Sequence, residues 1–555
     1  MPEDPVHVQL DVSIPMRDGV RLYAALYRPA GGAPPFPTLL IRSPYSTQHP
    51  RYVDWALRFA RGGYAVVLQD CRGRYESEGD WTPYSDDIPD GEDTLGWLSR
   101  QGWCNGQVGT FGISYPGFTQ VLMAASPQPC LKALVPIANQ EDNYGHLRYN
   151  GLLQLQNAMN FVWVGRRTNQ NAPRDLIDWP AVYRRLPLLT ALDDIADRPF
   201  YREVVRHSLF DEFWSDCSMK RRYADVQAPA LFISGWYDNL LHEIFKCFRG
   251  WTTQARSQHA RSLTRLLVGP WVHSQIGGPV PGELSFGPES QMDMAGLHLR
   301  WYDYHLRQIE NGVGTEAPVR IFVMGDNQWR DETEWPLART EYRKYYLRSF
   351  GNASSVLSEG ALTTDPPGSQ PPDSFVYDPE NPVPTLGGQG LLLDTAGPRD
   401  RSPIQQRPDV LVYSTPPLEQ DLEVTGPVGL RLFASSSAPD TDFTATLTDV
   451  TPTGQAIALS EGIVRARFRE SYTHPSLIVP GRVYTYDLPL WETSNVFKEG
   501  HRIRLEISSS NFPRFDRNLN TGLDPGTTHQ YQAAKQTIRH DTAYPSHLIL
   551  PVIPR

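Results

Sequence analysis

The chain has 555 residues, which is too long for one hydrophobic core, because single cores stop growing at about 250 to 300 residues. Its composition, 40% hydrophobic and 21% charged, excludes a disordered protein. A net charge of -10 without any basic run argues against nucleic-acid binding. The sequence shows neither a signal-peptide pattern nor the 18 or so apolar residues of a membrane span, so we expect a cytoplasmic protein without membrane contact.

The first 142 residues predict part of an α/β domain. Short alternating runs over residues 6–41 are typical of an antiparallel hairpin. Nearly continuous apolar runs follow, with helical patterns between them, at residues 37–41, 64–68, 108–111 and 133–137. Such runs indicate parallel strands that are buried on both faces of a sheet.

The pattern changes twice in the rest of the chain. Residues 143–228 are rich in aromatic residues, Arg and Leu at helical spacing, including 149–164 and 201–214, and predict a helical insertion. The sheet resumes within residues 229–316, with apolar runs at 230–234 and 263–268 and a helix at 297–305. Residues 317–555, including the run at 319–323, read as short strands between Pro- and Gly-rich turns, which favours a jelly-roll β-sandwich.

A serine between two glycines is the strongest chemical signal. Ser114 lies in Gly112-Ile113-Ser114-Tyr115-Pro116-Gly117, between a predicted strand and a predicted helix. This is the context of the nucleophile elbow of α/β-hydrolases, although the spacing has one more residue on the C-terminal side than G-x-S-x-G. A glycine-flanked serine also occurs by chance, so the interpretation depends on finding its partners.

A nucleophilic serine needs a histidine base and a carboxylate that orients the histidine. Asp238 and His273 each follow a predicted strand, and they come after Ser114 in the order of the α/β-hydrolase triad. The alternative role of Asp238 is to cap the next helix. His242 is the rival histidine, but four residues along that helix it would point along the surface.

The tetrahedral intermediate also needs donors for its negative oxygen. The backbone N–H of Tyr115, directly after the nucleophile, is one candidate. The loop after the strand at 37–41 carries Tyr45, whose phenol is a second candidate, with simple aromatic packing as the alternative.

Together these segments resemble the family of cocaine esterase and X-prolyl dipeptidyl-peptidases, with α-amino acid ester hydrolases and glutaryl cephalosporin acylases. The resemblance rests on residues 43–45, 69–74, 112–117, 235–238, 269–274, 503–514 and 518–520. It implies the α/β class: an α/β-hydrolase domain of residues 1–142 and 229–316, an inserted helical cap of residues 143–228 and a C-terminal jelly roll of residues 317–555. It also implies that Ser114, Asp238 and His273 form the triad, with Tyr45 and the Tyr115 amide as the oxyanion hole.

One motif of the resemblance departs from the family pattern. Cys71 stands in residues 69–74 where the family normally has a small apolar residue or valine. We interpret Asp70 and Arg72 of this motif as a structural charge pair that holds loops near the site.

Substrate choice is open at this stage. Glu141 and Asp142 could anchor a substrate ammonium, or could simply begin a solvated helix. Phe161 and Trp163 could wall an apolar acyl pocket, or could pack in a core. We expect a serine hydrolase that cleaves small carboxylic esters through an acyl-enzyme, without metal or cofactor. A homodimer is compatible with the sequence. The alternatives are an Xaa-Pro dipeptidyl-peptidase, an α-amino acid ester hydrolase or a cephalosporin-type acylase, and, less favoured, an inert carbohydrate-binding protein.

Overall fold

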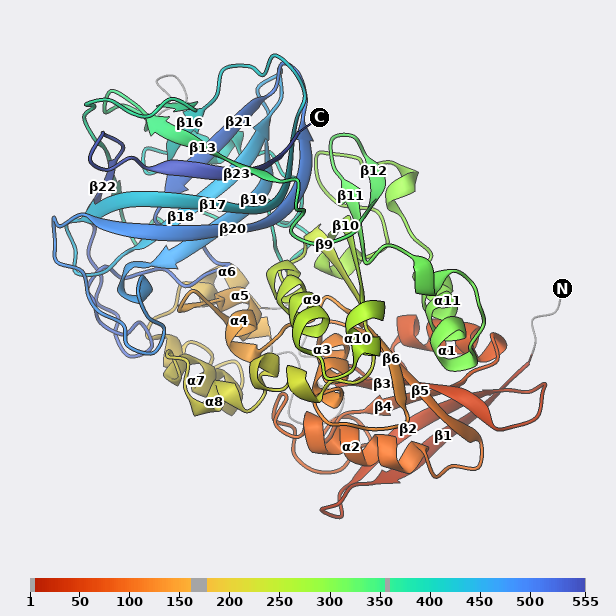
Figure 1. Cartoon of the computed structure of the whole chain (residues 1–555). Coiled ribbons are helices and arrows are strands. Elements are labelled where there is room, and N and C mark those ends of the chain that lie inside the picture. The colour runs from red at the N-terminus through yellow and green to blue at the C-terminus, as the bar shows by residue number, and fades with distance from the viewer. Residues whose placement is uncertain (1–4, 161–176, 355–359, 555) are drawn as a thin grey trace.

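The computed structural model describes residues 5–160, 177–354 and 360–554 (Figure 1). In this part of the chain ten strands form one sheet in the order β1-β2-β4-β3-β5-β6-β9-β10-β11-β12. Neighbouring strands from β4 to β11 are parallel, whereas β1, β2 and β12 pair antiparallel. The strands are β1 (Val6–Pro15), β2 (Arg21–Pro29), β3 (Phe36–Ser43), β4 (Ala65–Asp70), β5 (Cys104–Ile113), β6 (Leu131–Ile137), β9 (Leu231–Tyr237), β10 (Arg265–Val272), β11 (Val319–Val323) and β12 (Gln328–Glu332).

Helices cover both faces of this sheet. Along β3, Leu39 and Ile41 pack in one core with α1 and α11, while Leu40 packs in another core with α2, α3 and α9. The alternation explains why the inner strands are apolar throughout. The helices are α1 (Pro50–Arg61), α2 (Asp87–Leu98), α3 (Tyr115–Met123), α9 (Leu241–Gln254), α10 (Gln258–Leu263) and α11 (Met294–Arg307). No helix among the described residues is long and apolar enough to cross a membrane.

A group of short helices is inserted between β6 and β9 and lies below the C-terminal strands in Figure 1. These are α4 (Asn143–Leu147), α5 (Leu155–Asn160), α6 (Trp179–Tyr183), α7 (Pro199–Arg206) and α8 (Glu212–Ser215). We predicted a helical segment from residue 149, and its start was wrong. β7 (Arg148–Tyr149) and β8 (Leu152–Leu153) form a small hairpin there. Asn150 and Gly151, with φ of 49° and 83°, form its two-residue turn, as an Asn-Gly pair favours.

The run at residues 319–323 belongs to the first sheet and not to the C-terminal β domain, where we expected it. β11 pairs in parallel with β10 after the crossover through α11, and β12 then returns antiparallel to β11. Both strands therefore extend the hydrolase sheet, although their alternating pattern resembles that of the later strands.

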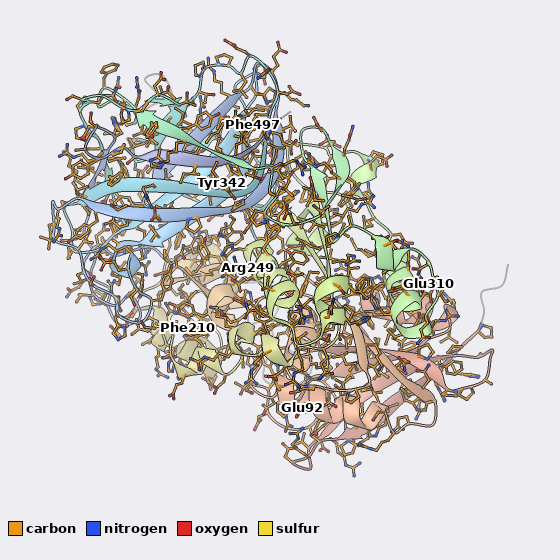
Figure 2. All side chains as sticks on the ribbon, in the orientation of Figure 1. Glu92, Phe210, Arg249, Glu310, Tyr342 and Phe497 are labelled. Atoms are coloured by element: carbon orange, nitrogen blue, oxygen red, sulfur yellow. The ribbon has the colours of Figure 1, made fainter. Side chains whose placement is uncertain are left out.

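The C-terminal unit is all-β apart from single helical turns such as α12 (Ser402–Gln405), and Figure 2 shows Tyr342 and Phe497 on it. Its described strands pair antiparallel except β14 with β16. They are β13 (Glu341–Arg348), β14 (Gly360–Thr363), β15 (Asp373–Tyr377), β16 (Leu411–Ser414), β17 (Leu422–Ser436), β18 (Asp442–Val450), β19 (Ala456–Arg465), β20 (Tyr484–Phe497), β21 (Arg502–Ser508), β22 (Ala534–Arg539) and β23 (His547–Ile553). The predicted fold class, an α/β core followed by an all-β domain, is confirmed.

The contact between β9 and β10 leaves no room for a side chain at Gly235. A Cβ atom there would lie 2.1 Å from the backbone oxygen of Trp271. Gly235→Ala should therefore push these strands apart and lower the unfolding free energy by about 1–3 kcal/mol, visible as a lower melting temperature.

Gly96→Ala in α2 is the matched control. Its Cβ would contact only the Arg100 guanidinium at 3.5 Å, and alanine favours a helix over glycine, so its melting temperature should stay level or rise. Equal melting temperatures for Gly235→Ala and wild type would contradict the packing argument.

Candidate active site

Ser114 lies on a strained turn between β5 and α3. Its backbone adopts φ 67° and ψ -121°, and its N–H donates to the Ile137 carbonyl at 2.9 Å. The flanking glycines are needed for steric reasons: a Cβ at Gly112 would lie 2.5 Å from Pro116 Cβ, and one at Gly117 would lie 2.6 Å from the Ile137 oxygen. The turn places the serine at the carboxyl end of the sheet, where this architecture presents its reactive groups.

The structure brings Ser114, His273 and Asp238 into one chain of contacts. His273 Nε2 is 3.0 Å from Ser114 Oγ, and His273 Nδ1 is 2.8 Å from Asp238 Oδ1. The buried Asp238 carboxylate also accepts the Ser234 hydroxyl at 3.1 Å and the Leu240 N–H at 2.9 Å. These donors fix the carboxylate, so that it can hold the imidazole with Nδ1 protonated and Nε2 facing the serine.

The rival histidine lies elsewhere. His242 is in α9, and its Nδ1 is 3.4 Å from Glu492 Oε2 in the C-terminal unit. The capping alternative for Asp238 is present in part, because its carboxylate does accept a backbone N–H near the start of α9.

Two donors lie beside the serine. The amide of Tyr115 is the first of α3, where a helix offers no internal partner. Removal from water raises the pKa of the Tyr45 phenol to about 12, although the nearby Ser114 side chain opposes the rise, so the phenol keeps its proton near neutral pH. The Tyr115 ring is directed away from the serine, since its hydroxyl donates to Asp87 Oδ2 at 2.8 Å and accepts the Tyr84 N–H at 2.9 Å.

Comparison with known proteins places this geometry in a family. The X-Pro dipeptidyl-peptidase (S15 family) model matches residues 18–275, and the X-Pro dipeptidyl-peptidase C-terminal non-catalytic domain matches residues 311–549. The chain is 40% identical to the cocaine esterase of Rhodococcus sp. (strain MB1 Bresler), over 99% of both chains. The chain belongs to the S15 family.

Solved structures of this family type share the whole architecture. An α-amino acid ester hydrolase superposes with a TM-score of 0.86 at 26% identity, covering 99% of this chain and 97% of the other. An aminopeptidase from a marine sediment Thaumarchaeota archaeon superposes with a TM-score of 0.85 at 26% identity, covering 100% and 97%. These relatives confirm, at the level of the family, the predicted enzyme class of a serine hydrolase with ester hydrolases among its members.

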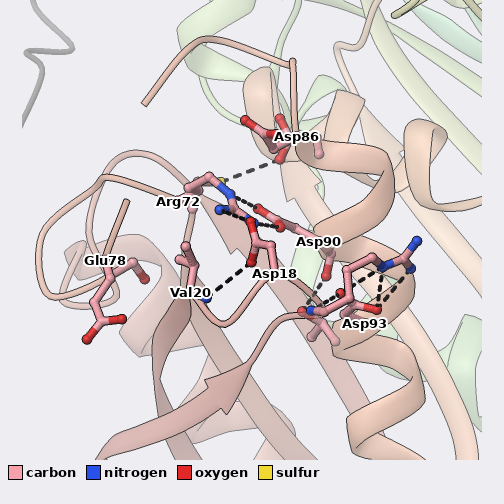
Figure 3. A network of polar contacts seen from close by, with 12 residues as sticks. Asp18, Val20, Arg72, Glu78, Asp86, Asp90 and Asp93 are labelled. Atoms are coloured by element: carbon pink, nitrogen blue, oxygen red, sulfur yellow. Dashed lines mark hydrogen bonds and ion pairs between the residues drawn. The ribbon is translucent and has the colours of Figure 1, made fainter. Parts of the chain in front are cut away.

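The charge pair expected within the family motif at residues 69–74 is not the one formed. Arg72 turns outward and pairs with Asp90, with Nε at 3.1 Å from Oδ2, and with Asp18, with Nη1 at 2.7 Å (Figure 3). Asp70 instead points toward the loop that carries Tyr45, so the predicted Asp70–Arg72 pair was wrong.

Asp70 and Arg74 hold that loop from two sides. The Asp70 carboxylate accepts the Thr47 N–H at 2.9 Å, and Arg74 Nε donates to the Pro44 carbonyl at 2.9 Å. These bonds bracket Tyr45 and fix where its phenol lies. Burial raises the pKa of Asp70 to about 7, while the Thr47 N–H and the Arg74 charge oppose the rise.

The acids considered for substrate binding are engaged by the chain itself. Glu141 accepts the Tyr223 hydroxyl at 2.7 Å, and burial raises the pKa of Glu141. Asp142 caps α4 through the Gly145 N–H, and its Oδ2 is 2.7 Å from Lys220 Nζ. Both carboxylates are buried, so they do not form the solvated helix start that was the alternative prediction. Phe161 and Trp163 lie outside the described residues.

A cavity of about 760 Å³ was not foreseen. We call it the cavity beside His273, because Ser274, the next residue in the chain, lines it. It is bordered by Ser274, Gln156 of α5, and Leu391, Leu392 and Leu393 of the C-terminal unit. An apolar triplet in a Gly-rich loop is the signal that could have pointed to it, because such a run would otherwise be exposed for no structural reason.

Asp70 should make stability depend on pH. Its pKa is raised from 3.8 to about 7, so the native state keeps a proton that the unfolded chain has lost, and stability falls as the pH rises through this interval. Asp70→Asn can still accept the Thr47 N–H but does not titrate. Between about pH 4 and 7 the unfolding free energy of Asp70→Asn should therefore increasingly exceed that of wild type, by at most about 4 kcal/mol. The measurement is the melting temperature of both proteins across this pH range.

Asp18→Asn provides the comparison in the same motif network. The hydrogen bond from Arg72 lowers the pKa of the exposed Asp18 carboxyl. Asp18→Asn should therefore slightly destabilise the protein at neutral pH, whereas Asp70→Asn should stabilise it. A difference between Asp70→Asn and wild type that does not change with pH would refute the account.

Proposed function

We propose that the protein is a serine carboxylic ester hydrolase that forms an acyl-enzyme on Ser114. The proposal is carried by the contact chain from Ser114 Oγ through His273 to Asp238, with distances of 3.0 and 2.8 Å. Family membership supports the same chemistry, since a cocaine esterase and an α-amino acid ester hydrolase are similar over nearly the full chain.

The geometry supports the following sequence of bond changes. Ser114 Oγ attacks the ester carbonyl carbon while His273 Nε2 takes its proton, and Asp238 stabilises the imidazolium that forms. The carbonyl oxygen becomes negative and accepts the Tyr45 O–H and the Tyr115 N–H. The C–O bond to the alcohol then breaks, and the leaving oxygen takes the proton from His273. Water repeats the sequence in the second half, releasing a carboxylic acid and free Ser114.

An ester of an apolar acid fits the surroundings better than a substrate with a free amine. A buried ammonium needs a carboxylate partner, but Tyr223 and Lys220 already engage Glu141 and Asp142. The cavity beside His273 offers the leucines at 391–393, and Asp394, the acidic residue in its described lining, is exposed to solvent. The runner-up is an aminopeptidase or X-Pro dipeptidyl-peptidase activity, which the archaeal aminopeptidase of the same fold keeps open.

Covalent labelling and a matched substrate pair test the proposal. A fluorophosphonate should label wild-type protein once, and Ser114→Ala should abolish both the label and the hydrolysis of p-nitrophenyl esters. Asp238→Asn should lower kcat by about 10⁴, because the imidazole loses its orienting carboxylate.

Xaa-Pro anilides decide between the two candidates. Strong anilide turnover with weak ester turnover would replace the esterase proposal by the peptidase, while labelling that survives Ser114→Ala would overturn the nucleophile.

Tyr45→Phe tests the second oxyanion donor. It removes only the phenolic hydroxyl, so kcat for ester hydrolysis should fall by about 10²- to 10³-fold with little change in KM. Tyr342→Phe, on the exposed face of β13, is the matched control and should leave both parameters unchanged. An unchanged kcat in Tyr45→Phe would assign Tyr45 a packing role.

A further inference from the structure

A second cavity lies where the helical insertion, the hydrolase core and the C-terminal unit meet. Its volume is about 320 Å³, and its described lining residues differ from those of the cavity beside His273. Contributions come from α4, from α9, from the loop between α7 and α8 that carries Phe210 (Figure 2), and from the C-terminal loop at Tyr472. The size is within the range of small-molecule sites.

Aromatic rings form one side of this second cavity. The Tyr144 and Phe210 rings meet edge to face at 5.3 Å, and the Tyr144 and Tyr472 rings lie 6.5 Å apart. The buried Tyr149 also lines the cavity. The Tyr472 hydroxyl donates to Asn150 Oδ1 at 2.9 Å. This bond orients the ring, although Tyr472 is 42% exposed. Such walls suit a planar ring of a ligand.

Two ammonium groups also line the second cavity. Lys220 Nζ is 2.7 Å from Asp142 Oδ2, and Lys246 Nζ is 2.7 Å from Glu243 Oε1. The carboxylates are 1% and 4% exposed, whereas the lysine side chains are 45% and 24% exposed. Each pair therefore presents its positive end toward the cavity. An ammonium has three donors, so one internal partner leaves others for a ligand.

The remaining charges near the cavity do not reverse this polarity. Arg148 donates to the Val204, Val205 and Gly151 carbonyls, and His242 faces Glu492 at 3.4 Å. Burial would lower the pKa of Lys220, but Asp142 outweighs it and raises the pKa, so the ammonium stays charged. Lys220 also lies 5.0 Å from the Phe210 ring centre, which joins the charged side to the aromatic side.

We propose that this second cavity binds an aromatic carboxylate, with the ring among Tyr144, Phe210 and Tyr472 and the carboxylate on Lys220 and Lys246. Two ammonium groups that are each partly neutralised match one negative charge better than a dianion. Binding here does not depend on the proposed function, although an aromatic carboxylate is also what hydrolysis of an aromatic acyl ester would release.

Benzoate is the probe, titrated calorimetrically into full-length protein whose Ser114 has been blocked with a fluorophosphonate. We expect benzoate to bind, and benzamide to bind about tenfold more weakly or worse, because it lacks the charge. Lys220→Met should weaken benzoate binding by about tenfold or more, while Lys344→Met, an exposed lysine on β13, should not change it.

Lys220→Met leaves Asp142 without its ammonium, so a second variant guards against misfolding. Tyr472→Ser keeps both ion pairs and removes an aromatic wall, and should also weaken binding about tenfold or more. No benzoate binding, or binding unchanged in a folded Tyr472→Ser, overturns the site.

A failure of Ser114 labelling would count against the proposed function alone. Benzoate would then be titrated into untreated protein, where the effects of Lys220→Met and Tyr472→Ser still decide whether this cavity is the site.

Discussion

The parallel alignment of the inner strands is the constraint on which the rest of the site depends. β3, β5, β9 and β10 end at the same edge of the sheet, and each is followed within two residues by one of the groups discussed above: Tyr45, Ser114, Asp238 and His273. Residues that are 35 and 159 positions apart in sequence therefore come within hydrogen-bond distance without a loop having to reach far. The strained backbone of Ser114 is tolerable because this packed edge holds it on both sides.

A buried polar network ties the side of the site that carries the proposed oxyanion donors to that edge. Arg42, at the end of β3, donates to Gln69 of β4 at 3.0 Å and pairs with Asp87 of α2 at 3.1 Å. Asp87 in turn accepts the Tyr115 hydroxyl from α3. A fully buried guanidinium is costly unless its charge is compensated, so these partners are mutually required. Their shared geometry fixes the relative positions of the Tyr45 loop and the first turn of α3.

Local patterns were enough to predict the parallel strands, the elbow and the order of the three polar residues, because each depends on neighbours in sequence. Several of the errors concern features set by distant residues. The sequence suggested a partner for Arg72 at the neighbouring Asp70. Its actual partners are Asp90 of α2 and Asp18 of the turn between β1 and β2. β11 alternates like a strand of the C-terminal unit, yet only the crossover through α11 decides which sheet it joins. The Asn150–Gly151 turn was visible in the sequence but was hidden among helix-forming neighbours.

The C-terminal unit also contacts the proposed active site, although its family counterpart is described as non-catalytic. Gln389 donates to the Trp236 carbonyl at 2.9 Å, and the backbone of Gly390 bridges to Asp238. These contacts hold the end of β9 at Trp236 and the backbone of Asp238, the proposed partner of His273. The same loop continues into the leucines beside the cavity next to His273. Because one loop both contacts the backbone at Asp238 and borders that cavity, the position of the proposed triad and the shape of the space beside it depend on the same packing between the two units.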